Sequence, residues 1–502
     1  MTETPGTVAL GDTPLTIEDV VAVARHRASL VLQPAAEARI AAARAVVDRY
    51  AASEIPVYGL TTALGAGVDT RLAHDDLVAF QRRVVPARAV AVGQPVATEI
   101  VRAMMTVRAA GMAAGGAGVS PPVFKGLVAA LNAGVHPLIP GLGSIGAADL
   151  APLAHLAYGL MGAGEAEFDG TIMPAEAALR AAGLVPLDLA PKDGHALLVA
   201  NAFSVGHACL VLHDITRLVG WLEAGAALNF EAFRANLSVL DDRALAARPA
   251  FGQRRAAERL RQLLADSGLW AEGAARRVQD PLSYRCVPQV FGALLHALDE
   301  VREATAIELA SSGDNPVVLA EAGLILSHGN FDLTAFVLAW ERLGQAMVHV
   351  ATGAAYRILK ITSSGFSDLP RFLTPYGQSR TGFATVQKTV SAMEAEIRHL
   401  ALPISFAPLP AADGVEDQAS MAPSVLTKTA GIVERLRYLV AIELIAAAQA
   451  VELRGAGDLG RGTAAAHGFV RRHVQPLEED RAQGFDIARL AEALVGTDFD
   501  PR

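Results

Sequence analysis

The chain has 502 residues and a formal net charge of −9, and 52% of its residues are hydrophobic although only 5% are aromatic. This acidic balance does not suggest a nucleic-acid or anionic-membrane partner, and two cysteines, Cys209 and Cys286, exclude a disulfide framework or a cysteine-based metal site. The length suffices for two or three domains, the many alanines and leucines favour helix-on-helix packing, and the low cysteine content is typical of a cytoplasmic protein.

The first third of the chain alternates predicted helices with glycine-rich loops. Apolar residues at helical spacing predict helix over 16–53, including the positions Val20, Val21, Val23, Leu30 and Leu32. A glycine-punctuated loop follows at 55–67. Helices are then predicted over 75–114 and 121–133, the second ending at Gly134.

Three glycines, at 141, 143 and 146, predict a loop, after which Asp149 and Pro152 open a helix over 150–162. Residues 165–173 are expected to form a hairpin that turns at Asp169-Gly170. The rest of the chain is predicted to be long helices, at 195–232, 253–267, 286–310, 331–361, 382–402 and 421–454. Several exceed the usual length of about 12 residues, so a bundle whose faces are also buried between subunits is expected.

Several polar residues could carry chemistry, and each also has a structural reading. Tyr58 could present its hydroxyl to a cleft or be an ordinary loop tyrosine, and Arg285 could hold a carboxylate or pair with Asp280. Asn315 and Asn330 could face a polar ligand or form Asx turns. A loop carboxylate such as Glu416 is usually solvated, but this one lies between apolar helices. The histidines show no metal-ligand spacing, so no metal is expected.

Gly143-Ser-Ile-Gly146 and Asp149-Leu-Ala-Pro-Leu153 match the two ends of a known signature, Gly-Ser-Val-Gly-Ala-Ser-Gly-Asp-Leu-Ala-Pro-Leu. In these runs the chain resembles the histidine/phenylalanine/tyrosine ammonia-lyase family, to which that signature belongs. Further matches are Tyr58-Gly59, Gln279-Asp-Pro-Leu-Ser-Tyr-Arg-Cys-Val-Pro-Gln289, Ser327-His-Gly-Asn-Phe331 and Gly414-Val-Glu-Asp-Gln-Ala-Ser-Met421. The resemblance runs from about residue 16 to Gly455.

The resemblance implies an all-α, ammonia-lyase/fumarase-like bundle, with a loop-rich N-terminal domain at 1–200 and long helices at 201–502. It implies a homotetramer in which Tyr58 and Glu416 come from subunits other than the one bearing Arg285. By resemblance Tyr58 is the base that takes the substrate's β-proton, Glu416 contacts the substrate amine or side chain, and Arg285 and Asn330 bind the carboxylate.

This chain departs from the family where the prosthetic group forms. The family cyclises and dehydrates Ala-Ser-Gly into a methylidene-imidazolone electrophile, whereas only Ala147-Ala148 separates Gly146 from Asp149 here. Neither alanine has a hydroxyl to eliminate, so no electrophile, and hence no cofactor, is expected.

Other departures replace polar residues of the family's motifs with apolar ones. Val199 replaces an orienting asparagine, with Asn201 two positions on. Leu282 replaces a tyrosine, and Tyr284, two positions on, is kept as a candidate substrate-binding residue. The family's selectivity pair becomes Ala87-Arg88. The cation at Arg88 would suit a carboxylate-bearing substrate, although an ion pair is the alternative.

The resemblance therefore implies a carbon–nitrogen lyase, or a related lyase, that acts without the electrophile on a small, carboxylate-bearing, amino-acid-like substrate. The alternatives are a homologue repurposed for another base-driven reaction, such as an isomerisation, dehydration or cyclisation, and a non-catalytic binding homologue.

Overall fold

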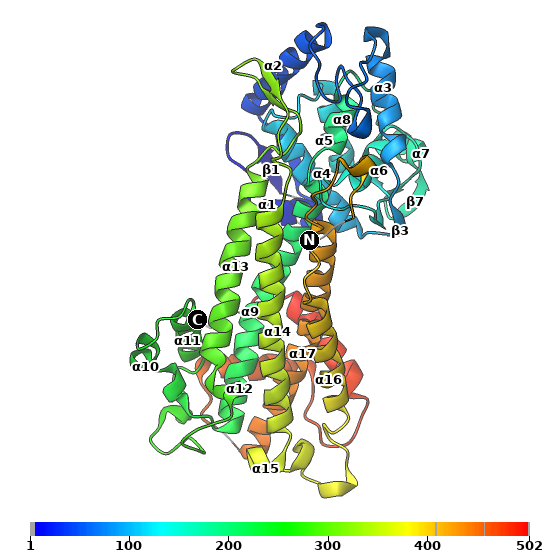
Figure 1. Ribbon diagram of the computed structural model, residues 1–502. Coiled ribbons are helices and arrows are strands. Elements are labelled where there is room, and N and C mark those ends of the chain that lie inside the picture. The colour runs from blue at the N-terminus through cyan, green and yellow to red at the C-terminus, as the bar shows by residue number, and fades with distance from the viewer. Residues whose placement is uncertain (1–5, 407–408, 456, 500–502) are drawn as a thin grey trace. The chain divides into compact units, whose positions relative to one another are not determined.

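The computed structural model describes residues 6–406, 409–455 and 457–499, which fall into two compact units. Unit 1 comprises Met1–His213, Arg302–Leu338 and Pro403–Leu426, and unit 2 comprises Asp214–Val301, Ala339–Leu402 and Thr427–Arg502. The described chain is mostly helical with a few very short strands, as predicted (Figure 1).

Unit 1 combines medium-length helices with four small sheets. Its helices are α1 (Ile17–His26), α2 (Pro34–Ala51), α3 (Leu77–Val84), α4 (Thr98–Ala113), α5 (Pro121–Ala133), α6 (Leu150–Leu160), α7 (Ala175–Ala181) and α8 (Asp193–Leu198). Its strands are β1 (Thr7–Leu10), β2 (Ser29–Leu32), β3 (Val92–Pro95), β4 (His136–Pro137), β5 (Pro140–Leu142), β6 (Glu165–Phe168), β7 (Thr171–Pro174), β8 (Val317–Leu319) and β9 (Leu324–Leu326). β1 pairs with β2 in parallel, and the other pairs, β3–β5, β4–β6–β7 and β8–β9, are antiparallel.

Two predicted helices of unit 1 are wrong in part. The helix over 16–53 is interrupted because α1 ends at His26 and is capped by Arg27, which has a left-handed φ of 56°. Leu30 and Leu32 then lie in β2 beside β1. The helix over 75–114 is interrupted because a 3₁₀ turn begins at Pro86 and β3 pairs with β5. In both places the partner strand lies at least 20 residues away, where local periodicity carries no information.

Other local predictions are confirmed. α5 ends at Gly134, whose φ is 79°, and β6 and β7 form the predicted hairpin with positive φ at Asp169 and Gly170.

Unit 2 is built from parts of the four longest helices together with shorter ones. The four are α9 (Ala202–Phe233), α13 (Val287–Leu309), α14 (Thr334–Ile361) and α17 (Ala422–Arg454). The shorter ones are α10 (Asp242–Ala246), α11 (Gln253–Leu263), α12 (Leu282–Arg285), α15 (Ser364–Ser367), α16 (Val386–Leu400), α18 (Arg461–His473) and α19 (Gln483–Val495).

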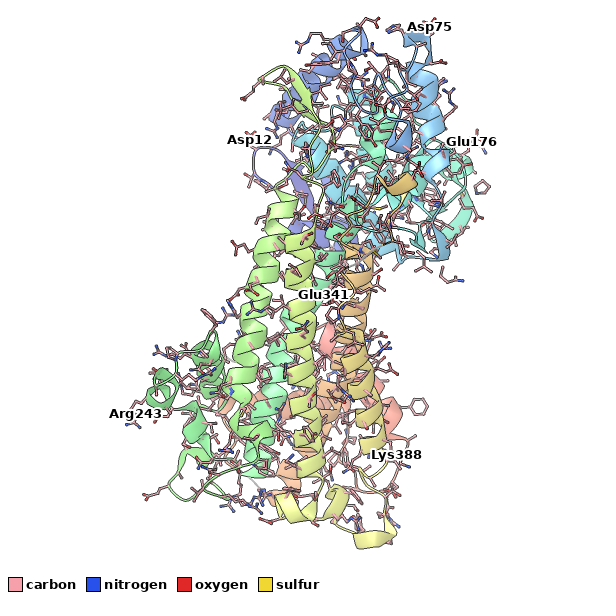
Figure 2. All side chains as sticks on the ribbon, viewed as in Figure 1. Asp12, Asp75, Glu176, Arg243, Glu341 and Lys388 are labelled. Atoms are coloured by element: carbon pink, nitrogen blue, oxygen red, sulfur yellow. The ribbon has the colours of Figure 1, made fainter. Side chains whose placement is uncertain are left out.

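Buried ion pairs join the helices of unit 2. The Arg357 guanidinium of α14 makes a two-pronged contact, at 2.6 and 3.0 Å, with the Glu443 carboxylate of α17, and both side chains are almost fully buried. Glu341, labelled on α14 in Figure 2, accepts a hydrogen bond from the Lys428 ammonium of α17. The apolar run Leu439–Val451 lies inside α17 and is buried, as predicted.

The predicted helix over 195–232 is broken at residues 199–201, so that α8 and α9 are separate. The stretch Asp193–Phe233 is long and apolar enough to cross a membrane by length and composition alone. However, 89% of its most apolar window is buried inside the protein, as in the core helix of a globular fold.

Candidate active site

A cavity of about 790 Å³ lies in unit 1, and every described residue that lines it belongs to that unit. The walls come from several loops, from α8 and from Leu150, the first residue of α6. They include Tyr58, Leu64, Val68, Arg88, Ala147, Ala148, Leu150, His195, Val199, Asn315, Phe331, Asp332, Val415, Glu416 and Asp417. Charged groups are thus set among apolar walls, the usual composition of a small-molecule site.

Tyr58 is fixed by the backbone of its own loop. The Val57 carbonyl accepts hydrogen bonds from three successive amides, and the Thr61 hydroxyl accepts a bond from the Val57 amide at 2.7 Å. The loop then returns so that the Gly65 amide donates to the Tyr58 phenolic oxygen at 2.9 Å. The phenol therefore faces the cavity with a main-chain donor already on its oxygen.

Arg88 lies at the end of the 3₁₀ turn Pro86–Arg88 and is half-buried. Burial lowers the pKa of its guanidinium, and the nearby Tyr58 and Glu416 oppose that effect. The three side chains are therefore electrostatic neighbours in one cavity, and Arg88 presents a cation that can receive a carboxylate.

Glu416 is placed by a tight loop in unit 1. Two backbone hydrogen bonds, at 2.9 and 3.1 Å, pair Ala411 with Glu416, and the turn between them has positive φ at Ala412, Asp413 and Gly414. Asp417 lines the same wall.

The loop at 143–149 is held from both sides. Gly146 has a φ of 74°, and a side chain there would come within 2.5 Å of the Ser420 hydroxyl, which donates to the Gly146 carbonyl at 3.0 Å. The Met421 amide donates to the Ile145 carbonyl at 2.8 Å. A glycine is therefore needed at 146 for close contact as well as for conformation.

Residues 147–149 do not fit a methylidene-imidazolone. Ala147 and Ala148 line the cavity without a hydroxyl that could be dehydrated, and the next amide, that of Asp149, is on a residue with a side chain and already donates to the Ala200 carbonyl at 2.8 Å.

α6 begins directly after Asp149, as predicted, but the Asp149 carboxylate makes no hydrogen bond to the first turn of that helix. It instead accepts the Ser204 amide in the first turn of α9 at 2.7 Å, and the hydroxyls of Ser204 and Ser144 at 3.0 Å each. The group is fully buried, and this burial raises its pKa to about 6 although the hydrogen bonds oppose the effect.

The structure places the predicted asparagines differently. Asn315 lines the cavity, and its side-chain oxygen accepts the His328 amide at 3.0 Å. Asn330 is exposed and lies outside the set of described residues that line the cavity, although Gly329 and Phe331 belong to it. Asn201 donates to the Phe331 carbonyl at 2.7 Å and so supports the cavity wall from behind.

Two predicted substrate contacts lie in unit 2. Tyr284 is 1% exposed, stacks on Phe233 with ring centroids 4.1 Å apart, and donates its hydroxyl to Asn229 at 2.8 Å. The Tyr284 hydroxyl therefore already has a buried partner within this chain, and a substrate-binding role for Tyr284 stays a prediction. Arg285 ends α12, and its Nε is buried without a hydrogen bond to any described residue.

Sequence reasoning missed His195, which lies in the cavity wall with its ring edge-on to Tyr58 at 5.6 Å between centroids. The available signal was a substitution, since the family motif that Pro191-Lys-Asp-Gly-His195 resembles has leucine at this position. Within the described ranges, no group of three or more His, Cys, Asp or Glu side chains is arranged to hold a metal ion.

Comparisons with known proteins identify the family of the chain. Residues 15–472 match the family model described as aromatic amino acid lyase. The histidine ammonia-lyase of Symbiobacterium thermophilum is 37% identical over 481 residues, which cover 96% of this chain and 95% of the relative.

Two solved structures extend the comparison. The crystal structure of the ergothioneine-degrading enzyme ergothionase from Treponema denticola, in complex with desmethyl-ergothioneine sulfonic acid, has a TM-score of 0.92 and 32% identity and covers 98% of both chains. The histidine ammonia-lyase of Trypanosoma cruzi has a TM-score of 0.90 and 29% identity, covering 98% of this chain and 93% of the other. The chain therefore belongs to the aromatic amino acid lyase family, which is a family of enzymes.

Proposed function

We propose that this chain catalyses the elimination of a tertiary amine from an α-amino acid betaine, and does so without a methylidene-imidazolone. The observation that carries the proposal is the wall formed by Ala147 and Ala148, which lacks the hydroxyl from which the electrophile would be made. An electrophile activates a primary amine for departure. A quaternary ammonium group already carries a permanent positive charge and leaves as a neutral amine.

The charges of the cavity suit such a substrate. Glu416, Asp417 and Asp332 line it, while Arg88 is the guanidinium on its wall. Carboxylates attract a quaternary nitrogen, and the apolar wall around Ala147 and Ala148 can contact its methyl groups. Arg88 can receive the substrate carboxylate.

The proposed reaction balances without another reactant. The Tyr58 oxygen, as phenolate, takes a proton from the β-carbon, and the electrons of that C–H bond form the new double bond. The bond between the α-carbon and nitrogen breaks, and its electron pair leaves with the amine. The products are an α,β-unsaturated carboxylate, a tertiary amine and the proton now on Tyr58. The Gly65 amide, already bonded to the phenolic oxygen, would stabilise the phenolate.

The relatives support this choice of substrate class. The Treponema structure is named as an ergothioneine-degrading enzyme, and ergothioneine is a betaine whose α-nitrogen carries three methyl groups. The same comparison supports an amino-acid-like substrate with an imidazole-type side chain.

We also propose a cytoplasmic homotetramer with shared active sites. Arg285 belongs to unit 2, whereas the cavity is lined from unit 1, and an arginine from a neighbouring subunit would add a second cation for the substrate carboxylate. Sedimentation at micromolar concentration tests the assembly, and a stable monomer that retains turnover would refute it.

The decisive experiment compares amines released from two substrates. The enzyme is incubated with ergothioneine and with histidine, and trimethylamine and ammonia are measured. We expect trimethylamine from the betaine and no ammonia from histidine. Brisk release of ammonia from histidine, together with an intact mass reduced by water, would refute the proposal.

Tyr58→Phe is expected to lower turnover at least about a hundredfold, since general base catalysis commonly contributes that much. The far-UV CD spectrum should remain that of the unsubstituted enzyme. Unchanged turnover would remove Tyr58 from the mechanism.

A further inference from the structure

The imidazole of His195 in the cavity wall has no part in the elimination described above. His195 lies on α8, is 2% exposed and lines the cavity. Its Nδ1 is buried against the Gly59 backbone and is therefore out of reach of a ligand in the cavity. A buried imidazole that borders a substrate cavity is placed to exchange a hydrogen bond with a ligand through its other ring nitrogen, Nε2.

The scaffold around His195 is built to hold the ring there. Gly59 has a φ of 68°, and a side chain on Gly59 would come within 1.8 Å of the His195 Nδ1, so the imidazole uses the space that glycine leaves. The fully buried Gln81 joins the two segments, donating to the Gly59 carbonyl at 2.9 Å and accepting the His195 amide at 2.9 Å. The ring is therefore fixed edge-on to Tyr58.

The ring is neutral in this setting. Burial, reinforced by the nearby cations Lys192 and Arg88, lowers its pKa well below the usual value. A neutral imidazole has one nitrogen that donates and one that accepts. With Nδ1 turned to the Gly59 backbone, Nε2 is left for a ligand.

We propose that His195 is a specificity-determining residue that accepts a hydrogen bond from an N–H group on the substrate's side-chain ring. The enzyme then selects betaines with an imidazole-type ring over those with a phenyl ring, because a phenyl ring would leave the buried imidazole unpaired. The selection between betaine substrates rests on the proposed function, whereas the preference for binding an imidazole-type ring does not.

The test uses two unreactive ligands that differ in the ring, urocanate and cinnamate. Their binding to the full-length enzyme is measured by titration calorimetry, which does not require turnover. We expect the unsubstituted enzyme to bind urocanate more tightly, and His195→Leu to reduce that preference at least about tenfold. Leucine is the family's residue in this motif and has a similar volume, so the variant should fold.

Two further variants make the result specific. His195→Asn keeps an acceptor and should restore part of the preference for urocanate. Val199→Ala alters the apolar wall of the same cavity and should change the binding of both ligands alike. An unchanged preference in His195→Leu, or no binding of urocanate by the unsubstituted enzyme, overturns the inference.

Turnover separates this inference from the proposed function. Trimethylamine release is measured from the trimethyl betaines of histidine and of phenylalanine. If neither betaine reacts but the urocanate preference depends on His195, the proposed function fails and the inference stands. If both react equally well before and after His195→Leu, the reaction stands and the inference fails.

Discussion

Asp149→Asn should change how the stability of this protein depends on pH. The Asp149 carboxyl is fully buried, and its pKa is raised from an ordinary 3.8 to about 6. The folded protein therefore binds this proton more tightly than the unfolded chain does. Its contribution to stability is fully present below about pH 4 and is lost as the pH rises through about 6.

The difference between the folded and unfolded pKa values corresponds to a contribution of at most about 3 kcal/mol to the free energy of unfolding. Roughly 1.4 kcal/mol of this contribution is lost between about pH 5 and about pH 7.5. Asparagine does not ionise, so this loss should disappear in Asp149→Asn. Its side-chain oxygen can still accept the Ser204 amide, and the hydroxyls of Ser204 and Ser144 can rotate to accept the new amide protons.

The measurement is urea denaturation followed by far-UV CD, at one protein concentration and at both pH values. The informative quantity is the free energy of unfolding of Asp149→Asn minus that of the unsubstituted protein. This difference should be larger at the higher pH, because only the unsubstituted protein loses stability as the pH rises. Asp149→Ala is the control: it leaves the Ser204 amide buried without an acceptor and should cost about 1–3 kcal/mol more than Asp149→Asn at both pH values. Identical pH dependence in the unsubstituted protein and Asp149→Asn would refute the reasoning.

Three other results are expected. Gly59→Ala should lower the melting temperature and weaken urocanate binding, because its methyl group meets the His195 ring at a left-handed φ; unchanged binding would contradict this. Arg357→Met should cost about 3–5 kcal/mol in urea denaturation by leaving Glu443 charged and buried, and adding Glu443→Leu should recover much of that loss. Intact-protein mass spectrometry should give the mass calculated from the sequence, and a peptide from 143–149 that has lost water would contradict the proposed absence of the electrophile.

Long-range periodicity made the larger part of the fold predictable. α14 and α17 each maintain helical spacing over many turns, and Gly134 and Asp169-Gly170 mark ends and turns that backbone conformation alone requires. β2 could not be foreseen, because its four residues become a strand only by pairing with β1.

The residues of the candidate site were predictable only where residue type and local motif were enough to indicate a role. Tyr58, Arg88 and Glu416 were found by residue type and motif, and the structure gathers them around one cavity. His195 was missed because its meaning depends on the space left by Gly59, which lies 136 positions earlier (195 minus 59) in the sequence. The partner of Tyr284 could not be foreseen, because nothing near it in sequence reveals the Asn229 side-chain oxygen that accepts its hydroxyl hydrogen bond.

The hydrogen bond from the Gly65 amide to the Tyr58 oxygen has a consequence for how this enzyme could change over time. A donor supplied by the main chain survives almost any exchange of side chains in the surrounding loop. Residues of the cavity wall can therefore be substituted one at a time while the Tyr58 phenol keeps its hydrogen bond from the Gly65 amide. Substrate specificity can change in this way without loss of the group that acts as base.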